Sequence, residues 1–190
     1  MNILVLGDII GENAVKRVKE ILPKTIRENN IDFVIANGEN SADGMGITSK
    51  IFKDLMCAGV NVVTMGNHTW GKKDIFNIIE NKNLLRPANY PKDVLGNGYG
   101  IYEYNNKKIA VINLIGRVDM NVLSENPFIV VEEIINKIKD SVNIIIVDFH
   151  AEATAEKIEV KEPKKKTKKE KELEDTIEFE KLTTDEESAD

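Results

Sequence analysis

The sequence predicts an α/β protein built on a mainly parallel sheet whose faces are covered by helices. Two observations favour this class: short apolar runs alternate with helical segments, and several of the runs end in a glycine followed by polar residues. Because parallel strands need long crossover connections, a strand–helix–strand order is typical of such a sheet. The chain has 190 residues, enough for one domain with its own core.

The first half of the chain contains three apolar runs separated by helical patterns. Buried strands are expected at residues 3–6, 33–36 and 60–65. A helix over residues 14–28 carries valine and isoleucine at helical spacing, although Pro23 interrupts it. Thr48 is the expected N-cap of the next helix, and Gly59 is expected to end it.

The second half is predicted to contain a short helix, a hairpin and one more helix and strand. The hairpin turns at Asn105 and Asn106, since asparagine favours tight turns. The expected elements are a helix at 74–79, hairpin strands at 99–104 and 108–114, a helix at 130–139, and a strand at 143–149 that leads into His150.

Composition divides the chain into a predicted domain, residues 1–158, and a charged tail, residues 159–190. In residues 161–190, 19 of 30 positions are charged, so disorder is expected, with a weak helix around 170–182. The lysines of this tail are balanced by its acids, and the whole chain carries a net charge of −6. Binding to bulk nucleic acid is therefore not expected.

Other features indicate the cellular setting. No apolar stretch approaches the length of a transmembrane helix, and the N-terminus has no signal-peptide pattern, so a cytoplasmic protein without membrane contact is expected. The single cysteine, Cys57, excludes an internal disulfide framework and a thiolate zinc cage. Cys57 is expected to pack on the apolar face of its helix.

Polar side chains of metal-ligand type follow four of the predicted strands. These residues are Asp8, Glu39, Asn40, Asn67, His68 and His150. Because ligands collect outside the carboxyl ends of parallel strands, we expect these groups to meet at one edge of the sheet. Carboxylates, amides and imidazoles without thiolates suit manganese, iron or zinc.

Four further residues leave alternatives open. Trp70, close to His68, is equally a core residue or a wall for a nucleobase. Arg86 and Arg117 either bind phosphate or form salt bridges within loops. Asp148 lies inside an apolar strand, where a structural hydrogen bond is favoured over metal ligation.

The motifs resemble a known family. Gly66-Asn67-His68-Thr69 is similar to the Gly-Asn-His-Asp/Glu signature of calcineurin-like metallophosphoesterases. The resemblance to the YmdB-type phosphodiesterases covers about residues 1–158. It rests on Gly7-Asp8, Asn37-Gly38-Glu39-Asn40, Met65-Gly66-Asn67-His68-Thr69-Trp70, Arg86-Pro87-Ala88-Asn89, Asn113-Leu114-Ile115-Gly116-Arg117 and Asp148-Phe149-His150-Ala151-Glu152-Ala153-Thr154.

The resemblance implies a sandwich of β-sheets flanked by helices and a site for two divalent or trivalent ions, iron or manganese. Asp8, Glu39 and Asn40 would hold the first ion. Glu39 would bridge to a second ion bound by Asn67 and His150. His68 would donate a proton to the leaving oxygen. The implied substrates are nucleotide phosphodiesters, including 2′,3′-cyclic and 3′,5′-cyclic nucleoside monophosphates.

One part of the family pattern is absent from this sequence. The resemblance implies a later Gly-Thr-His-Thr-His segment that adds a histidine to each ion, together with further strands. The chain has two histidines in all, His68 and His150, so neither position can be filled. The expectation is an impaired phosphodiesterase, either a degenerate or frameshifted copy or a split protein completed by a partner. The partners considered are a homo-oligomer and a complementing fragment. The alternative is a catalytically inactive binding or regulatory module of the same fold.

Overall fold

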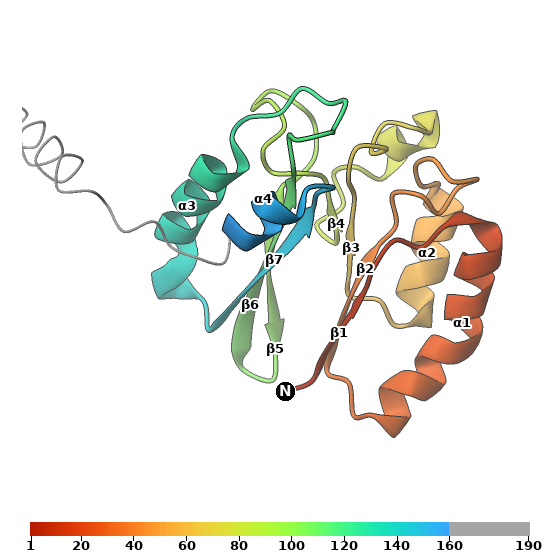
Figure 1. The fold of residues 1–190 in the computed structure, drawn as a ribbon. Coiled ribbons are helices and arrows are strands. Elements are labelled where there is room, and N and C mark those ends of the chain that lie inside the picture. The colour runs from red at the N-terminus through yellow and green to blue at the C-terminus, as the bar shows by residue number, and fades with distance from the viewer. Residues whose placement is uncertain (160–190) are drawn as a thin grey trace, which may run out of the picture. The chain divides into compact units, whose positions relative to one another are not determined.

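The computed structural model describes residues 1–159, which form four layers (Figure 1). Helices α1 and α2 cover a first sheet, a second sheet packs against its other face, and helix α3 covers the far side of the second sheet. The sandwich of sheets flanked by helices that the resemblance implies is confirmed. The predicted charged tail lies outside the described residues apart from Glu159, so its disorder and weak helix stay predictions.

The first sheet is parallel and carries the N-terminal half of the chain. Its strands, in spatial order, are β1 (Ile3–Leu6), β2 (Phe33–Asn37), β3 (Val62–Thr64) and β4 (Leu84–Leu85). Helices α1 (Gly11–Glu28) and α2 (Ser49–Ala58) connect the first three strands. In the register, Leu6 lies beside Ala36 and Asn37 lies beside Thr64. All four strands therefore end at the same edge.

The second sheet is mixed and departs from the single sheet expected from strand–helix alternation alone. It consists of β5 (Tyr99–Tyr104), β6 (Lys107–Ile115) and β7 (Ile144–His150), with α3 (Pro127–Ile138) before β7. Strands β5 and β6 form the expected hairpin, and Asn105 and Asn106 adopt φ values of +49° and +61°. Such a turn matches the twist of a hairpin. Because β7 pairs in parallel with β6, it belongs to this new sheet.

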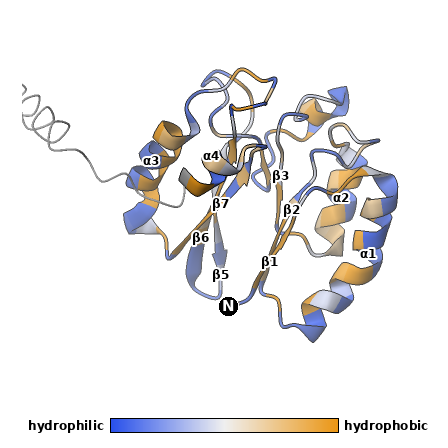
Figure 2. Cartoon of the chain, in the orientation of Figure 1, coloured by the Kyte–Doolittle hydropathy of each residue, from blue (hydrophilic) through white to orange (hydrophobic). Residues whose placement is uncertain are grey.

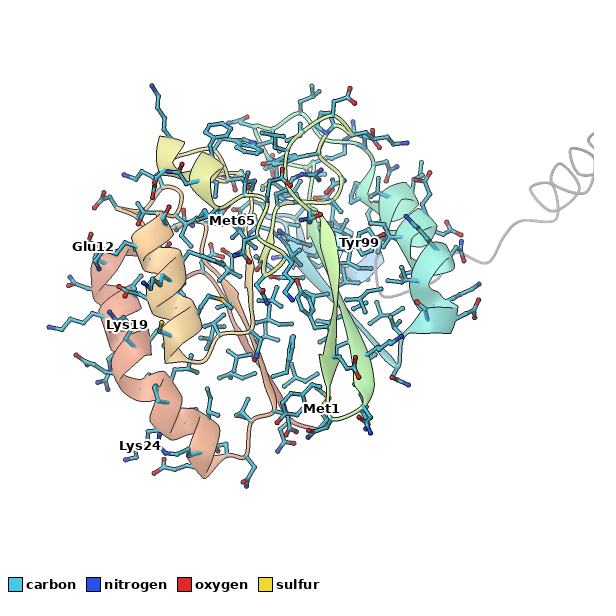
Figure 3. All side chains as sticks on the ribbon, turned by 180° about the vertical axis from the view of Figure 1, so that it is seen from behind. Met1, Glu12, Lys19, Lys24, Met65 and Tyr99 are labelled. Carbon is cyan, nitrogen blue, oxygen red and sulfur yellow. The ribbon has the colours of Figure 1, made fainter. Side chains whose placement is uncertain are left out.

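Three apolar clusters hold the layers together, and strands β1 and β2 are hydrophobic along most of their length (Figure 2). Leu22 of α1 and Leu55 of α2 pack against the outer face of the first sheet. Ile35 and Val111 meet between the two sheets, where side chains of β2 and β6 interdigitate. In contrast, the outer face of α1 is polar, and Glu12, Lys19 and Lys24 lie along it (Figure 3).

Helix α2 begins and ends as the sequence predicts. The Thr48 Oγ1 atom accepts a hydrogen bond from the Ile51 N–H (3.3 Å), and Gly59 adopts a left-handed conformation with φ +111°. The Val60 N–H then bonds back to the Leu55 carbonyl (3.2 Å). Val60 thus closes the helix, which explains why β3 starts at Val62 rather than at residue 60.

Several other expectations are corrected. Residues 74–79 form only a 3₁₀ turn, η1 (Lys73–Asn77), which has no side-chain cap at its N-terminus. The structure adds β4, a second 3₁₀ turn (Lys139–Ser141) and helix α4 (Thr154–Glu159), all too short to show a periodic pattern. Cys57 is exposed, because the buried face of α2 runs through Leu55 and Ala58 instead. Pro23 lies inside α1 without ending it.

Within the described range, no helix combines the length and the apolar character needed to cross a membrane.

Polar side chains join the two sheets just below their common edge. The buried Asn113 of β6 donates from Nδ2 to the carbonyls of Met65 (2.7 Å) and Leu85 (2.8 Å), which follow β3 and end β4. Thr64 Oγ1 donates to Asp148 of β7 at 2.5 Å, and burial raises the pKa of the Asp148 carboxyl. Asp148 thus has the structural hydrogen bond expected of it. Figure 3 labels Met65 at this junction.

Replacing Asn113 by alanine is expected to lower the free energy of unfolding by about 2–4 kcal/mol, since two buried carbonyls lose their donor. Urea unfolding followed by circular dichroism measures the change. Asn121→Ala, at an exposed loop position, serves as the control and is expected to change stability by less than about 0.5 kcal/mol. Equal stability of the two variants would contradict the role given to Asn113.

Candidate metal centre

The structure brings the six strand-end residues together. Asp8 follows β1, Glu39 and Asn40 follow β2, Asn67 and His68 follow β3, and His150 ends β7. Five of them come from the first sheet and His150 comes from the second. The cluster therefore lies where the ends of both sheets meet, not along the edge of one sheet as the sequence suggested.

Glu39 lies at the middle of this cluster, and its side chain is only 1% exposed. Its Oε1 atom is 2.9 Å from His150 Nε2 and 3.3 Å from Asn40 Nδ2, and its Oε2 atom accepts the backbone N–H of His68 at 3.0 Å. Burial by itself would raise the pKa of Glu39. The hydrogen bonds from His150 and the His68 N–H outweigh burial, so the pKa is lowered and the carboxylate stays ionised.

His150 holds a proton where two oxygens converge. Its Nε2 atom lies 2.9 Å from Glu39 Oε1 and 3.0 Å from Asn67 Oδ1, and its Nδ1 atom lies 3.8 Å from Asp8 Oδ1. Burial lowers the pKa of His150, but the bond to Glu39 and the nearby carboxylates raise it more. A cation that displaced this proton would meet an imidazole nitrogen, a carboxylate oxygen and an amide oxygen.

Asp8 completes a group of donors with spacing suited to a metal ion. Ligand atoms of Asp8, Glu39 and His150 all lie within 4.8 Å of one another. The set of hard oxygen and imidazole donors fits manganese, iron or zinc. Asn40 is turned so that its Nδ2 atom faces Asp8 Oδ2 (3.2 Å). Its amide nitrogen, rather than the ligating oxygen, therefore points to the carboxylates.

His68 lies beside the donors, with one ring nitrogen fixed. Its Nδ1 atom is 2.6 Å from the amide oxygen of Asn40, so Nδ1 carries a hydrogen and donates. This bond leaves Nε2 as the ring atom that is able to exchange a proton. One-third of the side chain remains exposed. His68 thus combines a fixed orientation with access from solvent, which suits a general acid.

Gly66 allows the two sheets to approach so closely. A Cβ atom at this position would collide with the Glu39 carboxylate and with the His150 ring. The Gly66 carbonyl accepts hydrogen bonds from Tyr90 Oη (2.9 Å) and Thr69 Oγ1 (2.6 Å), which fix the turn. The sequence indicated a turn glycine here, but the close approach depends on β7, which no local pattern reveals.

The two candidate arginines do not behave alike. Arg86 is buried and donates to the backbone carbonyls of Pro87 (2.7 Å), Val94 (3.1 Å) and Leu95 (3.2 Å), so it orders a loop through carbonyls rather than through a salt bridge. Phosphate binding by either arginine stays a prediction. Arg117 is exposed, and its backbone N–H donates to the buried carboxylate of Glu156 (2.9 Å). No sequence pattern indicated Glu156, because its partners are backbone groups.

Comparison with known proteins gives consistent matches. A family model described as "YmdB-like protein" matches residues 4–162. The chain is 44% identical over 159 residues to the 2′,3′-cyclic-nucleotide 2′-phosphodiesterase of Bacillus subtilis (strain 168), covering 83% of this chain and 60% of the relative.

Solved structures agree with these matches. A crystal structure of a novel phosphatase from Mycoplasma pneumoniae is 38% identical with a TM-score of 0.77, covering 83% of this chain and 58% of that one. A hypothetical protein from Thermus thermophilus is 33% identical with a TM-score of 0.78, covering 84% and 62%. The chain thus spans about 60% of the length of these relatives.

Metal binding is expected to release the proton held by His150. The hydrogen bond to Glu39 and the nearby carboxylates raise the pKa of His150, which favours the protonated imidazole, so a proton and Mn²⁺ compete for this side chain. The affinity for Mn²⁺ should rise about tenfold per pH unit below that pKa and level off above it. Titration calorimetry in buffers of different ionisation enthalpy counts the protons released. An Mn²⁺ affinity that does not change with pH would contradict the role of His150 as a ligand. The His68→Ala variant is the control and should show the same dependence of Mn²⁺ affinity on pH as the parent.

A second prediction uses two glycines at the same edge. Gly66→Ala is expected to weaken Mn²⁺ binding by more than about tenfold, because the new methyl group displaces Glu39 and His150. Gly7→Ala, beside Asp8, meets no atom within 4 Å and should bind as the parent does. Calorimetry measures both affinities, and circular dichroism checks the fold. Equal affinities would show that Gly66 does not shape the centre.

Proposed function

Since the chain belongs to the YmdB-like protein family, we propose that it forms the metal- and phosphate-binding part of a phosphodiesterase acting on nucleotide phosphodiesters. The substrates are 2′,3′-cyclic or 3′,5′-cyclic nucleoside monophosphates, and the name of the Bacillus subtilis relative supports the first of these. The observation that carries the proposal is the position of His150 Nε2 between Glu39 and Asn67. Such convergence of ligand-type atoms from two sheets is what a cation requires.

In this proposal the centre would take two ions, iron or manganese. Asp8, Glu39 and Asn40 would hold the first, and the Asn40 amide would have to turn its oxygen toward the carboxylates to do so. Glu39, Asn67 and His150 would hold the second, so Glu39 would serve both ions. When bound, the ions supply positive charge that stabilises the phosphate in the transition state.

The protein's own residues handle the leaving group. The phosphodiester P–O bond breaks as water adds to phosphorus and gives up one proton to solvent, and the departing ribose oxygen needs a proton. His68 supplies it from Nε2, because Nδ1 is held by Asn40 in the orientation described above. His68 is one residue from Asn67, so the proton donor and one of the proposed ligands of the second ion lie in the same turn. The products are a phosphate monoester and a free hydroxyl.

The 190-residue chain supplies five ligand residues, of which His150 alone is an imidazole. The family resemblance places two further histidines in a Gly-Thr-His-Thr-His segment, and both histidines of this chain are already in the centre. We therefore expect the chain by itself to bind ions weakly and to turn over slowly. A polypeptide that carries the His-x-His pair, from a complementing fragment, is expected to raise both.

Hydrolysis of bis-p-nitrophenyl phosphate with excess Mn²⁺ tests the proposal. The chain alone is expected to be slow, and addition of the C-terminal segment of the Bacillus subtilis relative should increase the rate by at least about tenfold. Glu39→Ala should abolish the increase. Full activity of the chain alone would contradict the ligand count. No metal-dependent hydrolysis under either condition would favour a binding or regulatory module instead.

The role of His68 is tested by the leaving group. His68→Ala in the complemented protein is expected to slow hydrolysis of adenosine 2′,3′-cyclic phosphate by about 10²–10⁴-fold, since its alcohol leaves only when protonated. The rate of hydrolysis of bis-p-nitrophenyl phosphate, which releases a stabilised phenolate, should fall much less. Mn²⁺ affinity should stay unchanged, and exposed Lys73→Ala serves as the control. Equal losses on both substrates would rule out proton donation by His68.

A further inference from the structure

Three aromatic rings form a cluster at the same end of the molecule as the metal centre. Trp70 stacks on Phe76 with ring centroids 5.7 Å apart and an interplanar angle of 22°, and it lies 6.5 Å from Tyr90 at 29°. Tyr90 is buried, but Trp70 is 37% exposed and Phe76 is 59% exposed. Trp70 and Phe76, which we call the aromatic shelf, therefore present ring surface to solvent while Tyr90 supports them from the protein side.

The aromatic shelf is tied to the centre by short contacts. Trp70 follows His68 by two residues, and the next N–H, that of Gly71, donates to the His68 carbonyl at 2.9 Å. Tyr90 Oη donates to the carbonyl of Gly66, the residue at which an added Cβ atom would collide with the Glu39 carboxylate and the His150 ring. Trp70 of the shelf thus belongs to the turn that carries the candidate proton donor, His68.

The exposure of the shelf distinguishes the two roles open to Trp70. A core tryptophan is covered by its neighbours, whereas this one shares an open surface with Phe76, which is more exposed still. Stacking of a nucleobase on an aromatic side chain contributes about 1–3 kcal/mol and depends little on base identity. Neither ring supplies a ligand to the proposed ions, so the shelf contributes to substrate binding only through stacking and apolar contact.

We propose that the aromatic shelf binds the nucleobase of the nucleotide whose phosphate is held at the metal centre. The inference rests on the proposed function and adds the part of the substrate that the metal centre leaves unrecognised. Because recognition is through ring faces, purines bind more tightly than pyrimidines, and neither is excluded. A phosphodiester without a base binds through its phosphate alone.

Tryptophan fluorescence reports directly on the shelf, since Trp70 is the single tryptophan of the chain. With Zn²⁺ present, adenosine 2′,3′-cyclic phosphate is expected to quench the emission, and ribose 2,3-cyclic phosphate is not. Trp70→Ala should raise the dissociation constant of the adenosine ligand, measured by calorimetry, about 5–150-fold and leave that of the ribose ligand unchanged. Leu123→Ala, at an exposed loop position, should change neither.

Phe76→Ala gives an independent reading, because its exposed side chain is not needed for folding and Trp70 remains as the reporter. The substitution is expected to weaken binding of the adenosine ligand and to leave binding of the ribose ligand unchanged. Equal weakening of both ligands, or no quenching by the adenosine ligand, would overturn the proposal. The proposal would also be overturned if the complementing segment itself quenched the Trp70 emission and prevented the nucleotide from binding, because the shelf would then bind polypeptide. Each of these results leaves hydrolysis of bis-p-nitrophenyl phosphate, and hence the proposed function, separately measurable.

Discussion

The centre depends on one buried carboxylate, that of Glu39. An ionised carboxylate removed from water is costly unless hydrogen bonds replace its hydration. Here the replacement donors are the imidazole of His150, the backbone N–H of His68 and the amide of Asn40. These donors come from the ends of three different strands, so satisfying Glu39 fixes where β2, β3 and β7 end relative to one another.

Contacts between the two sheets also help to hold Glu39 and its hydrogen-bond donors in place. Asn113 and the Thr64–Asp148 pair join the two sheets just below the edge, and Gly66 leaves room for His150 to reach Glu39. The ligand atoms of Asp8, Glu39 and His150 therefore lie close together before any ligand arrives, whereas the Asn40 amide has to turn. For the first three residues, little of the binding energy is lost to ordering side chains. In our proposal the exposed aromatic shelf adds affinity for a base, and it does so with residues outside the metal ligands.

Most of the first sheet and the clustered site residues were predictable from the sequence, because the end of a strand is marked by a local pattern. Apolar runs closed by polar residues located β1, β2 and β3, and they identified Asp8, Glu39 and the other clustered residues. The second sheet was not predictable from alternation, since the pairing of β7 with β6 is a non-local choice. Glu156 was missed because it binds backbone N–H groups, and Cys57 was misplaced by a small error in helical phase.

Nitrogen-15 NMR of the two histidine rings tests the central claim most directly, because His68 and His150 are the only histidines in the chain. On addition of Zn²⁺, which is diamagnetic, the Nε2 atom of His150 is expected to lose its proton. Its resonance should then move to the range of a metal-bound nitrogen. His68 should keep its hydrogen on Nδ1. Retention of the His150 Nε2 proton at saturating Zn²⁺, or coordination by His68 instead, would contradict the account.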